Sequence, residues 1–271
     1  MSERPLIWPM RAILWVGGGF VLVAGVQLFL FPTRTDEIFA WTIDSRMSVT
    51  LLGSFYGGAA VLALLSAREP VWSRARLGVP GVLAFVWLTL AATLLHLDLF
   101  HLDEGDARAQ MAAWTWLVIY VAEPLLLTLA FILQLRAPGG NPPRSDPLPG
   151  SYRVLLLSQA ALLGALGAVL FAVPLEVAEI WPWQLTELTG RAIAAWMIAL
   201  GGLLAAIAWE GDRSRIRLGT YMVGTLVSLQ AIALARFGGE LDSSSVEAMI
   251  YVASLASLGL TGVWGWRIST G

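Results

Sequence analysis

Eight uninterrupted apolar runs, each about 20 residues long, constrain the fold of this chain more than any other feature. They cover residues 12–31, 47–66, 77–97, 111–133, 154–173, 192–209, 218–235 and 246–266. A helix of about 20 residues is long enough to cross the roughly 30 Å hydrocarbon core of a bilayer. A membrane β-barrel would instead show alternating segments of about ten residues, and the sequence has no such pattern. We therefore predict an all-α fold, a polytopic membrane bundle of eight transmembrane helices.

Residue usage agrees with this prediction. Hydrophobic residues make up 57% of the 271 residues and charged residues only 13%, whereas a soluble domain carries about 25% charge. Cysteine is absent, which excludes disulfides and thiolate metal sites. The first apolar run ends in Phe31-Pro32-Thr33-Arg34 without an A-x-A cleavage site. We therefore expect this run to be a retained helix and not a signal peptide.

The basic residues indicate the orientation of the bundle. All 17 are arginine, a usage we associate with bacterial proteins. With a cytoplasmic N-terminus, 12 of the 17 fall on inside segments: Arg4, Arg11, Arg68, Arg74, Arg76, Arg136, Arg144, Arg153, Arg213, Arg215, Arg217 and Arg267. Positive residues favour the cytoplasmic side of short loops. We predict a multi-pass protein of the cell (plasma) membrane with both termini in the cytoplasm.

The two halves of the chain resemble each other. At an offset of 142, Arg11 matches Arg153, Gly25 matches Gly167, Pro32 matches Pro174, and residues 37–41 match residues 179–183. At an offset of 141, residues 73–78 match residues 214–219. We interpret residues 1–136 and 152–271 as two four-helix repeats, joined by a Pro/Gly-rich cytoplasmic linker at 137–151. Because each repeat has an even number of spans, the two repeats are parallel.

Two further patterns recur in both halves. Span two carries Gly53-x-x-x-Gly57, and span six carries Ala195-x-x-x-Ala199. Small residues four apart allow helix backbones to approach in lipid, so we predict close contacts for spans two and six. The loops after spans one and five share the pattern Glu-Ile-aromatic-x-Trp, and we expect their tryptophans to anchor short helices at the lipid headgroups. These tryptophans are Trp41, Trp181 and Trp183.

A single acid interrupts the fourth apolar run. Glu123 lies near the middle of residues 111–133, where a charge costs at least about 2.5 kcal/mol on insertion scales. Helical spacing places Trp116, Tyr120 and Glu123 on one face. Pro124 has no N–H, so the Tyr120 carbonyl loses its usual donor. The aligned position in span eight is Ser254, so any site here belongs mainly to the first half.

These residues suggest an outward-facing pocket for a small molecule. Its candidate lining residues are Glu123, Tyr120, Trp116, Tyr56, Ser54, Thr93 and His96. The alternative is that Glu123 is a protonated, hydrogen-bonded residue that only packs helices. Intramembrane acids are functional by default, which favours the pocket.

A second candidate site lies in residues 94–106, which contain both histidines. His96, Asp98 and His101 could bind Zn²⁺ or Mn²⁺, although their spacing requires a helix break near residues 97–100. The alternative is a solvated acidic loop. No catalytic or cofactor motif is present, so we expect no cofactor and lean against an enzyme.

The most favoured activity is therefore small-molecule binding or transport by an integral membrane protein. A membrane-embedded metal-binding enzyme and an accessory or scaffold subunit of a membrane complex are the alternatives. The expected partners are the lipid bilayer and a small-molecule ligand, and no nucleic acid. The sequence does not determine the oligomeric state.

Overall fold

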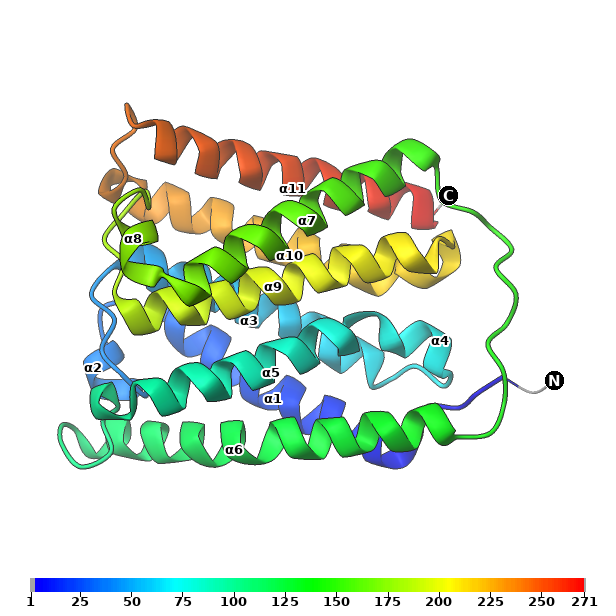
Figure 1. The fold of residues 1–271 in the computed structure, drawn as a ribbon, viewed down its shortest axis with the longest axis horizontal. Coiled ribbons are helices and arrows are strands. Elements are labelled where there is room, and N and C mark those ends of the chain that lie inside the picture. Colours follow the sequence, from blue (N-terminus) through cyan, green and yellow to red (C-terminus); the bar gives the residue numbers. More distant parts are fainter. Residues whose placement is uncertain (1–2, 271) are drawn as a thin grey trace.

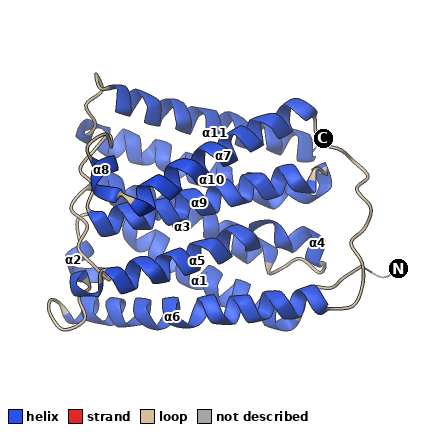
Figure 2. Ribbon diagram, viewed as in Figure 1, coloured by secondary structure: helices blue, strands red, loops and turns tan. Residues whose placement is uncertain are grey.

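The computed structural model describes residues 3–270, and their regular structure is helical (Figure 2). Within this range there is no strand, only three isolated β-bridges. Eight helices in the described part of the chain are long and apolar enough to span a membrane: α1 (Trp8–Leu30), α3 (Arg46–Ser66), α5 (Val79–Leu95), α6 (Ala107–Arg136), α7 (Gly150–Ala172), α9 (Glu187–Glu210), α10 (Arg213–Phe237) and α11 (Val246–Thr270). The predicted all-α fold with eight transmembrane helices is confirmed, and the chain is a multi-pass membrane protein.

Short helices lie at the two ends of the bundle (Figure 1). One end carries both chain termini, α4 (Trp72–Ala75) and the 3₁₀ turn η1 (Arg76–Gly78), and we call it the termini end. The opposite end, which we call the far end, carries α2 (Thr35–Ile38), α8 (Pro174–Ala178) and the 3₁₀ turns η2 (Leu97–Leu99) and η3 (Gly238–Glu240). The sequence predicts that the termini end is cytoplasmic.

Helices α3 and α9 form the centre of the bundle. The apolar windows of both are 72% buried, whereas those of α1, α7 and α11 are 22% buried. The outer helices instead expose large apolar side chains, including Val16, Val23, Leu125, Leu129, Val154, Leu166, Leu260 and Val263. In a bilayer these side chains face lipid tails, which are as apolar as leucine, so their exposure is stable there.

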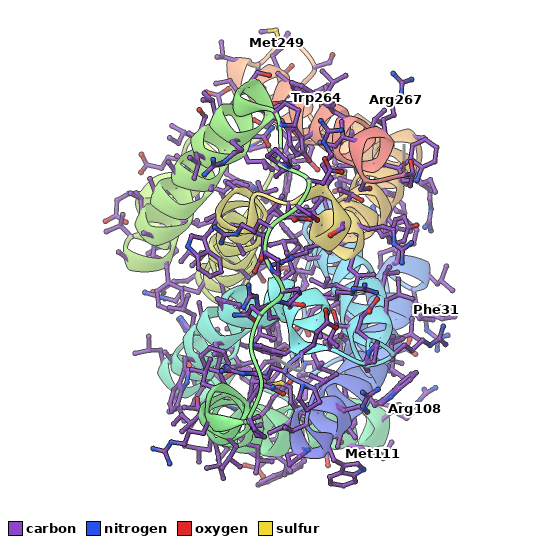
Figure 3. All side chains as sticks on the ribbon, turned by 90° about the vertical axis from the view of Figure 1, so that its right-hand side faces the viewer. Phe31, Arg108, Met111, Met249, Trp264 and Arg267 are labelled. Carbon is purple, nitrogen blue, oxygen red and sulfur yellow. The ribbon has the colours of Figure 1, made fainter. Side chains whose placement is uncertain are left out.

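Each central helix packs against one helix of its own half and one of the other half. Helix α3 packs against α1 and α10, and α9 packs against α7 and α5. Seen along the helices from the termini end, the second four helices lie above the first four (Figure 3). Helices α5 and α10 therefore join the two halves.

Two close backbone approaches occur in matched positions of the two halves. A Cβ atom on Gly25 of α1 would lie 3.0 Å from the Gly57 nitrogen, and one on Gly167 of α7 would lie 3.0 Å from the Ala194 carbonyl oxygen. These contacts make Gly53 and Gly57 equivalent to Ala194 and Ile198 of the second half, at an offset of 141. The sequence comparison instead pairs Gly53 and Gly57 with Ala195 and Ala199. The matched contacts support the duplication, which remains an interpretation of the sequence.

The contact between α3 and α9 is aromatic. The rings of Phe55 and Trp196 stack with centroids 5.6 Å apart and planes at 5°. The small residues of α3 face other helices, because a Cβ on Gly53 would lie 2.9 Å from the Phe29 nitrogen of α1 and one on Gly57 would lie 2.7 Å from Leu229 Cδ1 of α10. Spans two and six thus make close contacts, but mainly with their other neighbours.

The loop tryptophans Trp41 and Trp183 do not anchor the protein in the headgroup layer. They are only 2% and 6% exposed. Trp41 Nε1 donates to Thr189 Oγ1 at 3.3 Å, and Trp183 Nε1 donates to Ser48 Oγ at 2.8 Å. The anchoring prediction is wrong for these two residues, because each loop folds back onto the central helix of the opposite half.

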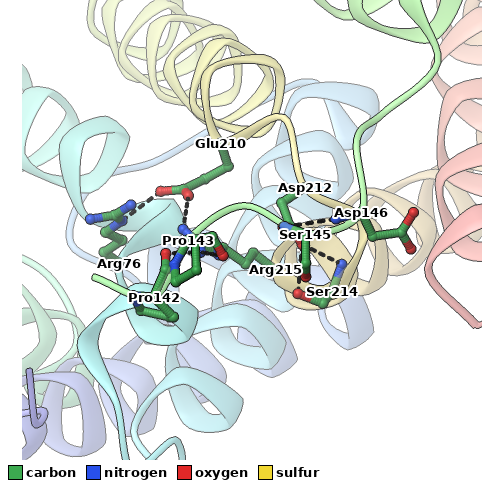
Figure 4. A network of polar contacts seen from close by, with 9 residues as sticks. All are labelled: Arg76, Pro142, Pro143, Ser145, Asp146, Glu210, Asp212, Ser214 and Arg215. Atoms are coloured by element: carbon green, nitrogen blue, oxygen red, sulfur yellow. Dashed lines mark hydrogen bonds and ion pairs between the residues drawn. The ribbon is translucent and has the colours of Figure 1, made fainter. Parts of the chain in front are cut away.

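Ion pairs fix the linker at the termini end (Figure 4). Glu210, buried at the end of α9, pairs with Arg76 at 2.5 Å and with Arg215 at 3.3 Å. Arg215 also donates to the carbonyl oxygens of Pro142 and Pro143. The residues from Ala137 to Pro149 contain no helix and no strand, yet these bonds hold them against the second half.

Candidate functional site

The residues predicted to form one pocket fall into separate groups. Four of them make a buried cluster between α3, α5 and α6. Trp116 Nε1 donates to Thr93 Oγ1 at 3.0 Å, and the hydroxyls of Tyr56 and Tyr120 lie 3.0 Å apart. The rings of Trp116 and Tyr120 pack with centroids 4.3 Å apart. The polar atoms of this aromatic cluster bond to one another, so the cluster is a packed wall.

Glu123 lines a cavity of about 60 Å³ that lies mainly between the four helices of the first half, with Trp196 of α9 also lining it. Its walls are apolar apart from Glu123 and Ser66, and are formed by Ile13, Leu14, Gly17, Gly18, Val21, Ala59, Leu62, Ala63, Ala75, Gly78, Val79, Val82, Phe85, Val86, Leu127 and Trp196. A water molecule needs about 10–15 Å³ of such space, whereas drug-sized ligands occupy about 300–1,000 Å³. The cavity therefore suits a solute of few heavy atoms or a few waters.

The cavity extends from Glu123 toward the termini end. Ser66, Ala75 and Gly78 line it there, and neither Thr93 nor His96 belongs to its walls. The aromatic cluster occupies the side toward the far end. The cavity thus lies on the opposite side of Glu123 from the expected outward-facing opening. The rings of the aromatic cluster fill the space where that opening was expected.

Helix α1 approaches the Glu123 carboxyl at a glycine. A Cβ atom on Gly17 would lie 2.9 Å from Glu123 Oε1, so a larger residue there would displace the carboxyl. Among the described residues, Glu123 has no hydrogen-bond or ion-pair partner. Helix α6 continues through Pro124, whose carbonyl accepts a bond from Thr128 Oγ1 at 2.6 Å. The packing alternative required a satisfied carboxyl, and no group within residues 3–270 satisfies this one.

Ser54 belongs to a different contact. Its hydroxyl donates to Gln230 Oε1 of α10 at 3.0 Å, and Gln230 Nε2 donates to the Tyr251 hydroxyl. Ser54 therefore joins the first half to the second and does not face Glu123. Sequence spacing could not show this, because it does not determine which helices become neighbours in lipid.

His96 lies at the far end of α5 and contacts the second half. Its Nε2 is 2.6 Å from Arg191 Nη1, and Arg191 also pairs with Glu187 at 2.5 Å. A guanidinium can only donate, so Nε2 accepts and the ring is neutral. Desolvation by burial, with the Arg191 charge next, lowers the pKa of His96, while Glu187 and Asp98 act in the opposite direction.

The three predicted metal ligands are not gathered around one point. His101 uses both ring nitrogens within the far-end loops, with Nδ1 3.0 Å from the Phe39 carbonyl oxygen and Nε2 3.0 Å from Thr42 Oγ1. Asp98 is exposed. Across residues 3–270, no group of three or more His, Cys, Asp or Glu side chains is placed to hold a metal ion.

The chain matches no protein-family model, no curated protein and no solved structure. Its function therefore has to follow from the geometry of its cavities.

Proposed function

We propose that this integral membrane protein binds a small cationic or weakly basic solute at Glu123, within the first four helices. One observation carries the proposal: a carboxyl group without a protein partner faces an apolar cavity inside the transmembrane region. A buried charge is stable when it is paired. A monovalent cation beside the carboxylate supplies that pairing.

The cavity restricts the solute by size and by direction of entry. Its volume of about 60 Å³ favours a solute of few heavy atoms. The aromatic cluster lies between Glu123 and the far end, so the solute would enter from the termini end. Transport would also require an opening past Trp116 and Tyr120. Binding is therefore the step that the geometry supports best.

Equilibrium dialysis of radiolabelled methylammonium against the protein in lipid nanodiscs tests this proposal. We expect saturable binding to the wild type and its loss in Glu123→Gln, which keeps the shape of the side chain but removes the charge. Glu104→Gln, in an exposed loop, is the matched control and should bind as the wild type does.

The thermal unfolding temperature of Glu123→Gln should stay close to that of the wild type. Equal methylammonium binding by the wild type and Glu123→Gln would contradict the proposal. A Glu123→Gln protein that no longer inserts or folds would favour the packing role instead.

A further inference from the structure

A second, larger hollow lies at the far end, between the two halves. Its volume is about 460 Å³, and we call it the inter-half groove. The first half contributes Ile43, Asp44, Ser45 and Ser48, and the second half contributes Leu175, Ala178, Glu179, Gln184, Leu185, Thr186 and Thr189. None of these residues lines the cavity at Glu123. The two hollows are therefore independent.

Two buried hydroxyl groups line the groove. Ser48 and Thr189 are each 1% exposed. The Ser48 oxygen accepts the Trp183 indole N–H, and the Thr189 oxygen accepts both the Trp41 indole N–H and the Thr186 hydroxyl. Each hydroxyl still has one hydrogen to donate, and in residues 3–270 neither hydroxyl donates to another group. A buried donor without an acceptor is unfavourable, so a ligand oxygen in the groove would satisfy these hydrogens.

The charged groups of the groove are both acidic. Asp44 and Glu179 line it from opposite halves, and both are exposed at its surface. In the described part of the chain neither carboxylate forms an ion pair, although the nearby Arg46 pairs with Glu240. The groove therefore offers negative charge on its walls and hydrogen-bond donors in its buried part.

We infer that the inter-half groove binds a small organic cation that carries a hydroxyl, ether or carbonyl oxygen. The ammonium group would lie near Asp44 and Glu179, and the oxygen would accept from Ser48 and Thr189. The groove volume lies in the range of about 300–1,000 Å³ that is typical of small-molecule sites. Because each half supplies one carboxylate and one buried hydroxyl, the ligand would bridge the two halves at the far end.

Isothermal titration of the protein in nanodiscs with three probes of similar size tests the inference. The probes are 3-amino-1-propanol, which has the charge and the oxygen, butylamine, which lacks the oxygen, and 1,3-propanediol, which lacks the charge. We expect 3-amino-1-propanol to bind best and each of the other two to bind at least about fivefold more weakly, as expected for loss of one surface charge pair or one hydrogen bond.

The double variant Asp44→Asn/Glu179→Gln should lower the affinity for 3-amino-1-propanol at least about fivefold and leave 1,3-propanediol unchanged. Glu176→Gln, also exposed on α8 but outside the groove, should bind all three probes normally. Both altered groove positions are exposed, so the double variant is expected to fold. Equal affinity for the three probes, or unchanged binding by the double variant, would overturn the inference.

Thr189→Val and Thr189→Ser test the buried donors. We expect the valine variant to bind 3-amino-1-propanol more weakly and the serine variant to restore binding, whereas butylamine should not distinguish the two. If a folded Thr189→Val protein bound 3-amino-1-propanol as the wild type does, Thr189 would not be a hydrogen-bond donor to the ligand. Glu123→Gln should leave the groove binding intact, which separates this site from the one proposed at Glu123.

Discussion

The two halves of the bundle match where helices pack and differ where single polar groups are buried. Arg11 donates to the Ala67 carbonyl of the first half, and Arg153 donates to the Ala208 carbonyl of the second. The loop tryptophans Trp41 and Trp183 likewise bond to equivalent hydroxyls of the opposite half. These matched contacts join helix ends and loops to the centre of the bundle, so their role is to hold the fold.

The unmatched polar groups have other roles. Glu123 faces a cavity in the first half, whereas the aligned residue in α11 is Ser254. Glu210 is buried between Arg76 and Arg215, whereas its counterpart Glu69 forms no ion pair within residues 3–270. The similarity between the two halves therefore does not by itself require these acids. Each therefore needs a local explanation, either a ligand or the linker.

The largest expected effect comes from Glu210→Gln. This change leaves Arg76 and Arg215, only 13% and 5% exposed, without their carboxylate. Breaking a buried ion pair typically costs about 3–5 kcal/mol. We expect a loss of about 3 kcal/mol in the free energy of unfolding, measured by titration with a denaturing detergent.

Glu69→Gln is the matched change in the first half. It should alter the free energy of unfolding by less than about 0.5 kcal/mol, as is usual for sites without a buried partner. Similar losses in the two variants would break the distinction between matched and unmatched groups.

The next largest effect concerns the helices that join the halves. A Cβ on Gly81 of α5 would lie 2.5 Å from the Ala199 carbonyl oxygen, and one on Gly58 of α3 would lie 3.0 Å from the Met222 carbonyl oxygen. Overpacking of this kind costs about 1–3 kcal/mol. We expect Gly81→Ala to lose about 2–3 kcal/mol and Gly58→Ala about 1 kcal/mol in the same unfolding assay.

Gly224→Ala in α10 provides the control for these glycine variants. No atom would lie within 4 Å of its Cβ, and alanine is the better helix former. We expect unchanged or slightly higher stability. A loss at Gly224 as large as that at Gly81 would mean that helix approach is not the cause.

Trp41→Phe and Trp183→Phe test whether the matched loop contacts are energetically equivalent. Each change removes one buried indole N–H donor and some packing, and should lower stability by about 1–2 kcal/mol. Trp8 is 77% exposed, so Trp8→Phe is the control and should change the free energy of unfolding very little. A large difference between the two buried variants would show that the halves use their loops differently.

The sequence was sufficient to predict the spans but not their neighbours. The apolar runs at 47–66 and 111–133 lie within one and four residues of the ends of α3 (Arg46–Ser66) and α6 (Ala107–Arg136), because length and hydropathy determine a span. Trp41 and Thr189 are 148 residues apart in the chain, and no periodicity links them. The cavity at Glu123 likewise depends on Gly17 of another helix.

The smallest effect concerns His96, whose counterpart at an offset of 141 is the non-titrating Phe237. Burial and the Arg191 charge lower the pKa of His96 in the folded protein, while its unfolded value is about 6.5. As the pH is lowered through about 6.5, the unfolded state therefore binds more protons than the folded state. The free energy of unfolding then decreases until the pH is below the folded pKa of His96. We expect the unfolding temperature to drop between pH 7 and pH 5.

His96→Gln should reduce this pH dependence, because glutamine can accept the Arg191 hydrogen bond without titrating. His101→Gln is the control, since His101 bonds only within the far-end loops of the first half. A pH dependence that survives in His96→Gln would assign it to a group other than His96. Loss of the dependence only in His96→Gln would place a pH-sensitive contact between α5 and α9 that the second half does not repeat.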